Sequence, residues 1–202
     1  MSEQHIYVLS ERALATVIAQ ISDDQWELRK PEWFQTGGQG DASLREIVNY
    51  HAYDSAWVPD VLAGRTIAEV GEQYEHLKTG PGIADYGAYS AKAVAAAEPL
   101  DDPAKIVHLS YGDLPAREYL KHITSFRGFR VYDIAKWIGA DRQLPGDLVQ
   151  GMWDEFVPEV EAWRAMGVFG PALPVPDDAP LQDRLLGLVG RDPGTVQGSP
   201  TP

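Results

Sequence analysis

Residues 43–64 read SLREIVNYHAYDSAWVPDVLAG, and this stretch decides the fold that we expect. Ser43 and Glu46 have the spacing of a helix capping box, and Gly64 is a residue at which helices commonly end. Between them the apolar residues recur every three or four positions, which is the period of one helix face. The stretch therefore predicts a long amphipathic helix, with a kink at Pro59.

A second stretch, residues 115–139, has the same period, begins with a proline that suits a first helical turn and ends at a glycine. In both stretches ionisable residues interrupt the apolar face. An unpaired charge on a face that packs against a core is costly, so such residues are expected either to pair with one another or to form a site. The two predicted faces consist of Ile47, His51, Asp54, Val58 and Val61 in the first stretch and of Tyr119, Ile123, Phe126, Arg130, Asp133 and Trp137 in the second.

The composition is that of a globular protein and excludes several classes of function. The chain has 202 residues, of which 44% are hydrophobic, so it is long enough to fold as one domain around its own core. It contains no cysteine, which excludes disulfides, thiolate metal ligands and a cysteine nucleophile. With 30 acidic and 17 basic residues its net charge is -13, which argues against a nucleic acid as partner.

The chain is also expected to work away from membranes. It contains no apolar run of about 18 residues that could span a bilayer. Its N-terminal residues, MSEQH, lack the basic and apolar regions of a secretion signal. These features predict a cytoplasmic protein, and its acidic surface leaves a small-molecule substrate or another protein as the expected partner.

Helix signals dominate the rest of the chain, which predicts an all-α fold. The helices are expected at about residues 4–21, 43–64, 82–97, 115–139, 147–166 and 181–189, with a short extended stretch at 105–110. Asp113 is expected to cap the helix that starts at Pro115, and Pro158 is expected to bend the helix that follows. Four or five long helices joined by loops favour an antiparallel bundle, in which sites are commonly built from side chains on facing helices.

Three segments are expected along the chain. Residues 1–169 are predicted to form the helical bundle. Residues 170–193 are predicted to form a proline-rich strap and a short helix that pack on the bundle. Residues 194–202 have no pattern that could pack, so they are predicted to be a disordered tail.

Several stretches resemble a known family. Residues 43–49, SLREIVN, with residues 61–65, VLAGR, look like the second helix of the DinB-like superfamily, in the branch of the mycothiol-dependent maleylpyruvate isomerases and mycothiol S-transferases. Residues 112–115, GDLP, with residues 133–139, DIAKWIG, are similar to the helix that bears metal ligands in that family. Residues 175–193, VPDDAPLQDRLLGLVGRDP, look like the closing segment of one of its subfamilies. The resemblance implies a DinB-like antiparallel four-helix bundle of up-down-down-up order with an extra C-terminal helical segment, a homodimer, and the use of a divalent metal ion and mycothiol.

The resemblance also places the family's metal ligands on particular residues. The family uses one histidine of the second helix and a His/His or Glu/His pair, four residues apart, on the fourth. In this chain these positions fall on Tyr50, with His51 one residue later, and on Phe126 and Arg130. Arginine has no lone pair to offer a cation, so the ligand positions are altered. The remaining candidate metal ligands are His51 and Asp54 on the first stretch and His122, which has ligand spacing to Glu118, on the second.

The same residues suggest a mechanism that needs no metal ion. His51 would act as the general acid and base, and Asp54 would orient its ring. Arg130 would stabilise an anion, with Asp133 beside it in the same cluster. The residues expected to line the substrate site are Tyr50, Trp57, Phe126 and Arg127.

Each of these roles has a structural alternative. His51 would equally serve as a satisfied histidine of the core, and Arg130 and Asp133, three positions apart, as a buried ion pair. Arg127 is interpreted as a surface residue, with a place at the mouth of the site as its alternative. For the whole chain the first hypothesis is a thiol-dependent transferase or isomerase, or a metal-free derivative, that acts on a small polar or anionic substrate. The second is a non-catalytic small-molecule-binding or regulatory protein that kept the bundle and lost the metal site.

Overall fold

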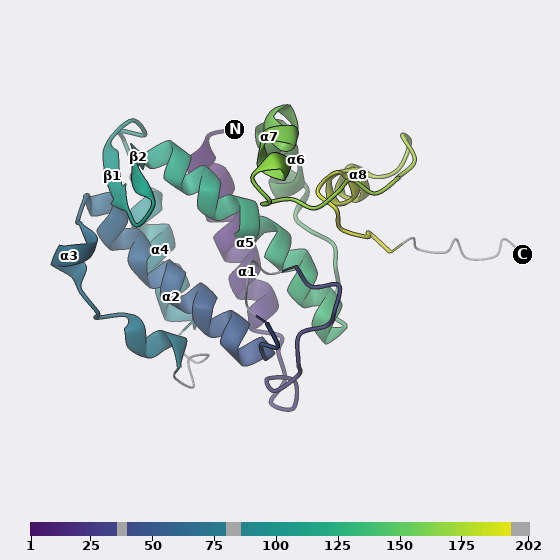
Figure 1. Cartoon of the computed structure of the whole chain (residues 1–202), viewed down its shortest axis with the longest axis horizontal. Helices are drawn as coiled ribbons and strands as arrows, with labels where there is room; N and C mark the ends of the chain where they lie inside the picture. Colours follow the sequence, from purple (N-terminus) through teal and green to yellow (C-terminus); the bar gives the residue numbers. More distant parts are fainter. Residues whose placement is uncertain (36–39, 80–85, 195–202) are drawn as a thin grey trace, which may run out of the picture. The chain divides into compact units, whose positions relative to one another are not determined.

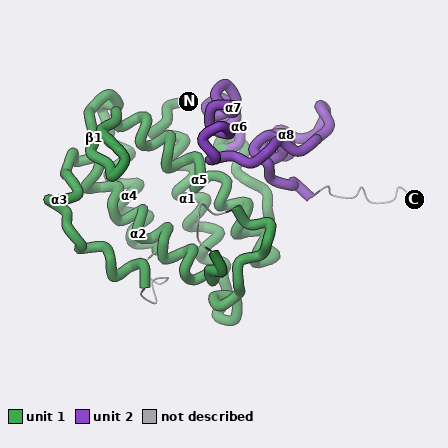
Figure 2. Tube along the Cα trace, viewed as in Figure 1, with its two compact units in different colours: residues 1–148 green, residues 149–202 purple. Residues whose placement is uncertain are grey.

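The structure is a computed structural model that describes residues 1–35, 40–79 and 86–194. The chain divides into two compact units, residues 1–148 and residues 149–202 (Figure 2). The boundary therefore falls before the predicted boundary at residue 169.

The reason for this earlier boundary lies in the second unit. There, Arg164 donates from Nε to the carbonyl oxygen of Gly170 at 3.1 Å and from Nη2 to that of Leu188 at 2.8 Å. These bonds tie the end of the predicted fifth helix to the strap and the last helix. The predicted tail, apart from Gly194, lies outside the described residues.

Four long helices form the framework of the first unit. They are α1 (Glu3–Ile18), α2 (Leu44–Ala63), α4 (Tyr86–Ala97) and α5 (Ala116–Ile138). Helix α1 packs mainly on α5 and α2 mainly on α4, and contacts between α1 and α4 join the two pairs. In Figure 1, α1 and α5 run in one direction and α2 and α4 in the other. The part of the chain that the structure describes is thus mainly helical, as predicted.

The ends of α2 and α5 are set by the residues that the sequence indicated. The Ser43 hydroxyl accepts from the Glu46 main-chain N–H at 3.2 Å, and the Glu46 carboxylate accepts from the Ser43 N–H at 2.7 Å, which completes the predicted capping box. Gly64 and Gly139 follow the two helices with φ of 85° and 73°, a conformation that favours glycine. Pro59 lies inside α2 without ending it.

A small hairpin precedes α5, in place of the predicted cap. Strands β1 (Ile106–Leu109) and β2 (Gly112–Pro115) pair antiparallel, and the second of them was not expected. The prediction that Asp113 caps α5 is wrong, because Asp113 lies in β2 and bonds to Nδ1 of His108 at 2.9 Å. The hairpin instead brings the carbonyl oxygens of Lys105 and Pro103 to the first N–H groups of the helix, at Ala116 (2.8 Å) and Arg117 (2.9 Å).

The remaining elements are short. Helices α3 (Ile67–Val70) and η1 (Glu75–Lys78), which the sequence did not indicate, follow α2. The predicted fifth helix is divided into α6 (Gly146–Phe156), η3 (Val157–Glu159) and α7 (Val160–Ala165), and Pro158 lies at the division as expected. The last helix is α8 (Leu181–Leu188). Within the described ranges, no helix combines the length and the apolar composition that crossing a membrane requires.

Gly187 fixes the contact between α8 and the strap, and its replacement gives a first prediction. A Cβ atom at this position would overlap Cγ2 of Val175 and lie 3.1 Å from the carbonyl oxygen of Leu173. The strap has little room to retreat, because the Leu173 N–H donates to the Gly187 carbonyl at 2.8 Å. Gly187→Ala is therefore expected to destabilise this contact by about 1–3 kcal/mol, measured as faster amide hydrogen exchange in α8.

The matched control is Gly87→Ala, also within a helix. A Cβ atom at Gly87 would meet nothing within 4 Å. Alanine is the better helix former, so this variant is expected to leave exchange in α8 unchanged. Unchanged exchange in both variants would contradict the steric argument.

Candidate functional site

A buried polar cluster joins the four long helices of the first unit. Glu11 of α1 and Arg127 of α5 form an ion pair in which Nε donates to Oε2 at 2.7 Å, and both side chains are 0% exposed. Oε1 of Glu11 accepts from the Ser55 hydroxyl of α2 at 2.9 Å and from the Tyr86 hydroxyl of α4 at 3.0 Å. The Tyr7 hydroxyl donates to Oε2 at 3.4 Å. We call Tyr7, Glu11, Ser55, Tyr86 and Arg127 the Glu11–Arg127 cluster.

The interpretation of Arg127 as a surface residue is wrong. Burial is the largest single effect and lowers the pKa of Arg127, but Glu11, Tyr7, Asp54 and Tyr86 together raise it by more, so the guanidinium keeps its charge in the core. Glu11 is not among the predicted site residues, although it lies at helical spacing between Tyr7 and Leu14 on the buried face of α1. That spacing is the signal by which it could have been found.

His51 of α2 is buried against Phe126 of α5. The two ring centroids are 6.0 Å apart with an angle of 26° between the planes, and Cζ of Arg127 lies 5.1 Å from the same Phe126 ring. Burial lowers the pKa of His51 well below its usual range, and the charges of Arg130 and Arg127 lower it further, so the ring is neutral. Nδ1 of His51 is buried and has no hydrogen-bond partner within residues 1–35, 40–79 and 86–194. The hydrogen bond by which Asp54 would orient the ring is therefore not found at this nitrogen.

Asp54 of α2 is half-buried, and the pKa of its carboxyl is closer to neutral pH than that of an ordinary carboxyl. The pKa of its carboxyl is raised to about 6, and desolvation is the largest cause. The charge of Arg127 lowers this pKa, and the charge of Glu11 raises it. Burial also raises the pKa of Tyr111, in the turn of the hairpin, and of Tyr119 in α5, and the charge of Asp54 raises both further. A carboxyl that titrates near neutral pH can both accept and release a proton.

Arg130 and Asp133 pair with each other as their spacing indicated. Nη1 of Arg130 donates to Oδ2 of Asp133 at 3.2 Å and to the main-chain oxygen of Gln35 at 3.0 Å. Its guanidinium also lies over the ring of Phe34, with Cζ 4.3 Å from the centroid. These contacts favour the structural alternative, a largely buried ion pair that holds the segment before α2 against α5.

Tyr50 and Trp57 belong to a row of aromatic side chains. Tyr50 is 45% exposed, and its ring lies 6.0 Å from that of Tyr53. The Trp57 ring lies 6.2 Å from Tyr53 and 5.6 Å from Tyr74. These contacts favour a packing role for both residues over the predicted role of lining the substrate site.

The side chains at the family's ligand positions do not fit a metal ion. Phe126 has no donor atom, and Arg130 brings a positive charge. Nδ1 of His122, the third candidate ligand, lies 3.3 Å from the hydroxyl of Tyr111. Among the residues that the structure describes, no three His, Asp or Glu side chains are grouped so that they could hold a metal ion.

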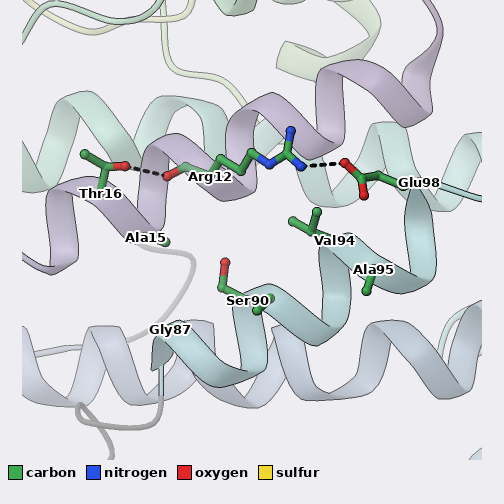
Figure 3. A pocket seen from close by; sticks show the side chains of 9 residues that line it. Arg12, Ala15, Thr16, Gly87, Ser90, Val94, Ala95 and Glu98 are labelled. Carbon is green, nitrogen blue, oxygen red and sulfur yellow. Dashed lines mark hydrogen bonds and ion pairs between the residues drawn. The ribbon is translucent and has the colours of Figure 1, made fainter.

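A shallow groove lies elsewhere in the first unit, between α1 and α4 (Figure 3). It has a volume of about 550 Å³, and small side chains such as Ala15, Gly87 and Ser90 line it. The exposed ion pair of Arg12 and Glu98, at 2.5 Å, joins α1 to the residue that follows α4. The predicted site residues are not among its lining, so we assign it no part in the function.

The side chains that carry chemistry are thus the Glu11–Arg127 cluster, the neutral imidazole of His51 and the carboxyl of Asp54. They come from all four long helices of one unit. Comparisons of the chain with protein-family models, with curated proteins and with solved structures find no match.

Proposed function

We propose that this chain is a DinB-like enzyme that acts on a small polar or anionic molecule at the facing sides of α2 and α5. The observation that carries the proposal is the buried Nδ1 of His51, which has no partner within the described ranges although it lies near cationic groups of α5. Buried polar atoms without a partner are rare in folded proteins, and a bound molecule is one of the few explanations. A ligand with a hydrogen-bonding oxygen would supply the missing partner.

The resemblance implies thiol-dependent transfer or isomerisation, and mycothiol would be the thiol. In such a reaction a thiolate adds to a carbon–carbon double bond, and the neighbouring carbon receives a proton; the reverse step removes the proton and expels the thiolate. Asp54 is the group suited to carry that proton, because its pKa of about 6 is close to neutral pH. His51, being neutral, would donate or accept a hydrogen bond to the substrate according to its tautomer.

The course of the chain supports the DinB-like assignment. The four long helices run in the order that the resemblance implies, with α1 and α5 opposed to α2 and α4 (Figure 1). We propose that the chain forms a homodimer, as the resemblance implies. We do not propose that it binds the family's metal ion, because Phe126 and Arg130 stand at ligand positions.

The test follows maleate in the presence of mycothiol and the full-length protein at pH 7, with NMR detection of the vinyl protons. We expect consumption or isomerisation of maleate above the uncatalysed rate. Asp54→Asn is expected to lower the catalysed rate by about a hundredfold or more, because it removes the proton carrier. His51→Ala is expected to lower the rate while leaving the helix content intact, and His76→Ala, at an exposed position of η1, is the control that leaves the rate unchanged.

The second candidate function is the non-catalytic small-molecule-binding or regulatory protein, and the complete burial of the Glu11–Arg127 ion pair favours it. It predicts that maleate raises the melting temperature of the protein without any turnover. If maleate is neither turned over nor raises the melting temperature, the proposed enzyme and this alternative are both overturned.

A further inference from the structure

His122 is a histidine that the sequence singled out and that the proposed function does not use. It lies on α5, four residues before Phe126, and its side chain is half-buried. Its Nδ1 lies 3.3 Å from the hydroxyl of Tyr111 in the turn of the hairpin, and the two ring centroids are 5.9 Å apart. Tyr111 is 62% exposed, so this contact lies where the protein meets water.

Helix geometry places His122 at the level of Asp54. Helices α2 and α5 run in opposite directions (Figure 1), and the stack of His51 on Phe126 marks one point at which they meet. From that point Asp54 lies three residues toward the end of α2, about 4.5 Å along the axis, and His122 lies four residues toward the start of α5, about 6 Å. Both steps lead toward the hairpin, which contacts both helices. In agreement, the charge of Asp54 raises the pKa of Tyr111 there.

The proposed reaction needs a base for its thiol. An ordinary thiol has a pKa of about 8.5, so it is mostly protonated at pH 7, whereas the nucleophile is the thiolate. His51 is unsuited to take that proton, because burial lowers the pKa of its ring well below the usual range. Asp54 already carries the proton of the carbon atom. An imidazole that reaches water, opposite Asp54, is the side chain that suits this transfer at neutral pH.

We propose that Nε2 of His122 takes the proton of the thiol, so that His122 is the general base that activates the thiol. This inference rests on the proposed function and names the residue that supplies its nucleophile. Tyr111 is the positioning residue. In the tautomer in which Nδ1 donates to the Tyr111 hydroxyl oxygen, Nε2 keeps the lone pair that accepts a proton.

The proton transfers balance over the cycle. Nε2 of His122 takes the proton, and the electron pair of the S–H bond stays on sulfur. The sulfur forms its bond to carbon while the pair of the double bond moves to the neighbouring carbon, which takes a proton from Asp54. In the reverse step Asp54 takes a proton from that carbon, the carbon–sulfur bond breaks, and His122 returns its proton to sulfur. Both residues thereby regain their initial forms.

The first experiment needs no turnover. Mycothiol is added to the full-length protein at pH 7 without maleate, and the ultraviolet difference spectrum measures the thiolate. We expect more thiolate than in free mycothiol at the same pH, and about tenfold less of this excess with His122→Phe. Tyr111→Phe, at an exposed position, is expected to lower the excess about threefold. The matched control is His108→Phe, which removes an imidazole held by Asp113 and leaves the excess unchanged.

The second experiment compares the rates of maleate turnover at pH 7 and pH 10. His122→Phe is expected to lower the rate about a hundredfold at pH 7 and about threefold or less at pH 10, because the thiol ionises in water at the higher pH. A variant with a merely damaged structure would lose rate equally at both pH values.

Several outcomes would overturn the role of His122. They are no excess thiolate with the wild type, as much excess with His122→Phe as with the wild type, and an equal loss of rate at both pH values. If His122→Phe does not fold, the wild type and Tyr111→Phe decide in the same way. Turnover of maleate would in those cases still support the proposed function, whereas excess thiolate without turnover would support His122 and count against that function.

Discussion

Glu11→Ala is expected to destabilise the first unit by about 3–5 kcal/mol. The change leaves the guanidinium of Arg127 charged, 0% exposed and without its counter-ion. It also removes the acceptor of the Ser55 and Tyr86 hydroxyls, which are buried. Amide hydrogen exchange in α1 and α5, which Glu11 and Arg127 join, measures the loss.

The control for Glu11→Ala is Arg12→Ala, which removes the ion pair formed by the next residue of α1. Arg12 and Glu98 are 59% and 50% exposed, so Arg12→Ala is expected to change stability by about 0–1 kcal/mol. The double variant Glu11→Met with Arg127→Met is expected to recover much of the lost stability, because apolar side chains replace both charges. A Glu11→Ala protein as stable as Arg12→Ala would show that the buried pair does not hold the four helices together.

Asp54→Asn is expected to stabilise the protein at pH 7.5 by about 1–3 kcal/mol and to have a much smaller effect at pH 4. The pKa of Asp54 is raised to about 6 in the folded protein, chiefly by desolvation, from an ordinary value of 3.8. Well below pH 3.8 the carboxyl is protonated in both states, so its burial costs no ionisation energy. Between pH 4 and 6 the unfolded chain loses its proton first, so the stability of the wild type falls as pH rises through this interval. The lower end of the range allows for the partial exposure of Asp54.

The measurement is the difference in unfolding free energy between Asp54→Asn and wild type from pH 4 to pH 8. A difference is needed because His51 acts in the opposite sense: its pKa is lowered by burial, so stability falls as pH drops below 6.5, where the unfolded imidazole takes up a proton. Asp23→Asn, at an exposed position of the loop after α1, is the control variant. A flat profile for Asp54→Asn as well would mean that its carboxyl is not desolvated, and the proposed proton carrier would lose its basis.

The helices themselves follow from the sequence, because their signals are local. The capping box of Ser43 and Glu46, the glycines at 64 and 139 and the interruption at Pro158 act within one or two turns of the chain, and the structure has each of them where it was predicted. The apolar period also identified His51, Arg130 and Asp133 as buried ionisable residues.

The positions of the buried charges relative to one another are a matter of tertiary structure. Glu11 and Arg127 are 116 positions apart in the chain, and the pattern of α5 alone does not show whether an arginine beside the apolar face meets water or a carboxylate from another helix. The packing of α1 on α5 and of α2 on α4 brings Glu11, Ser55, Tyr86 and Arg127 into contact. The hairpin before α5 depends in the same way on pairing between strands, which supplied the N–H partners that Asp113 was expected to provide. Local sequence thus determined where each helix begins and ends, whereas the partner of each buried charge was decided by packing, because a side chain's electrostatic environment is made by residues distant in the chain.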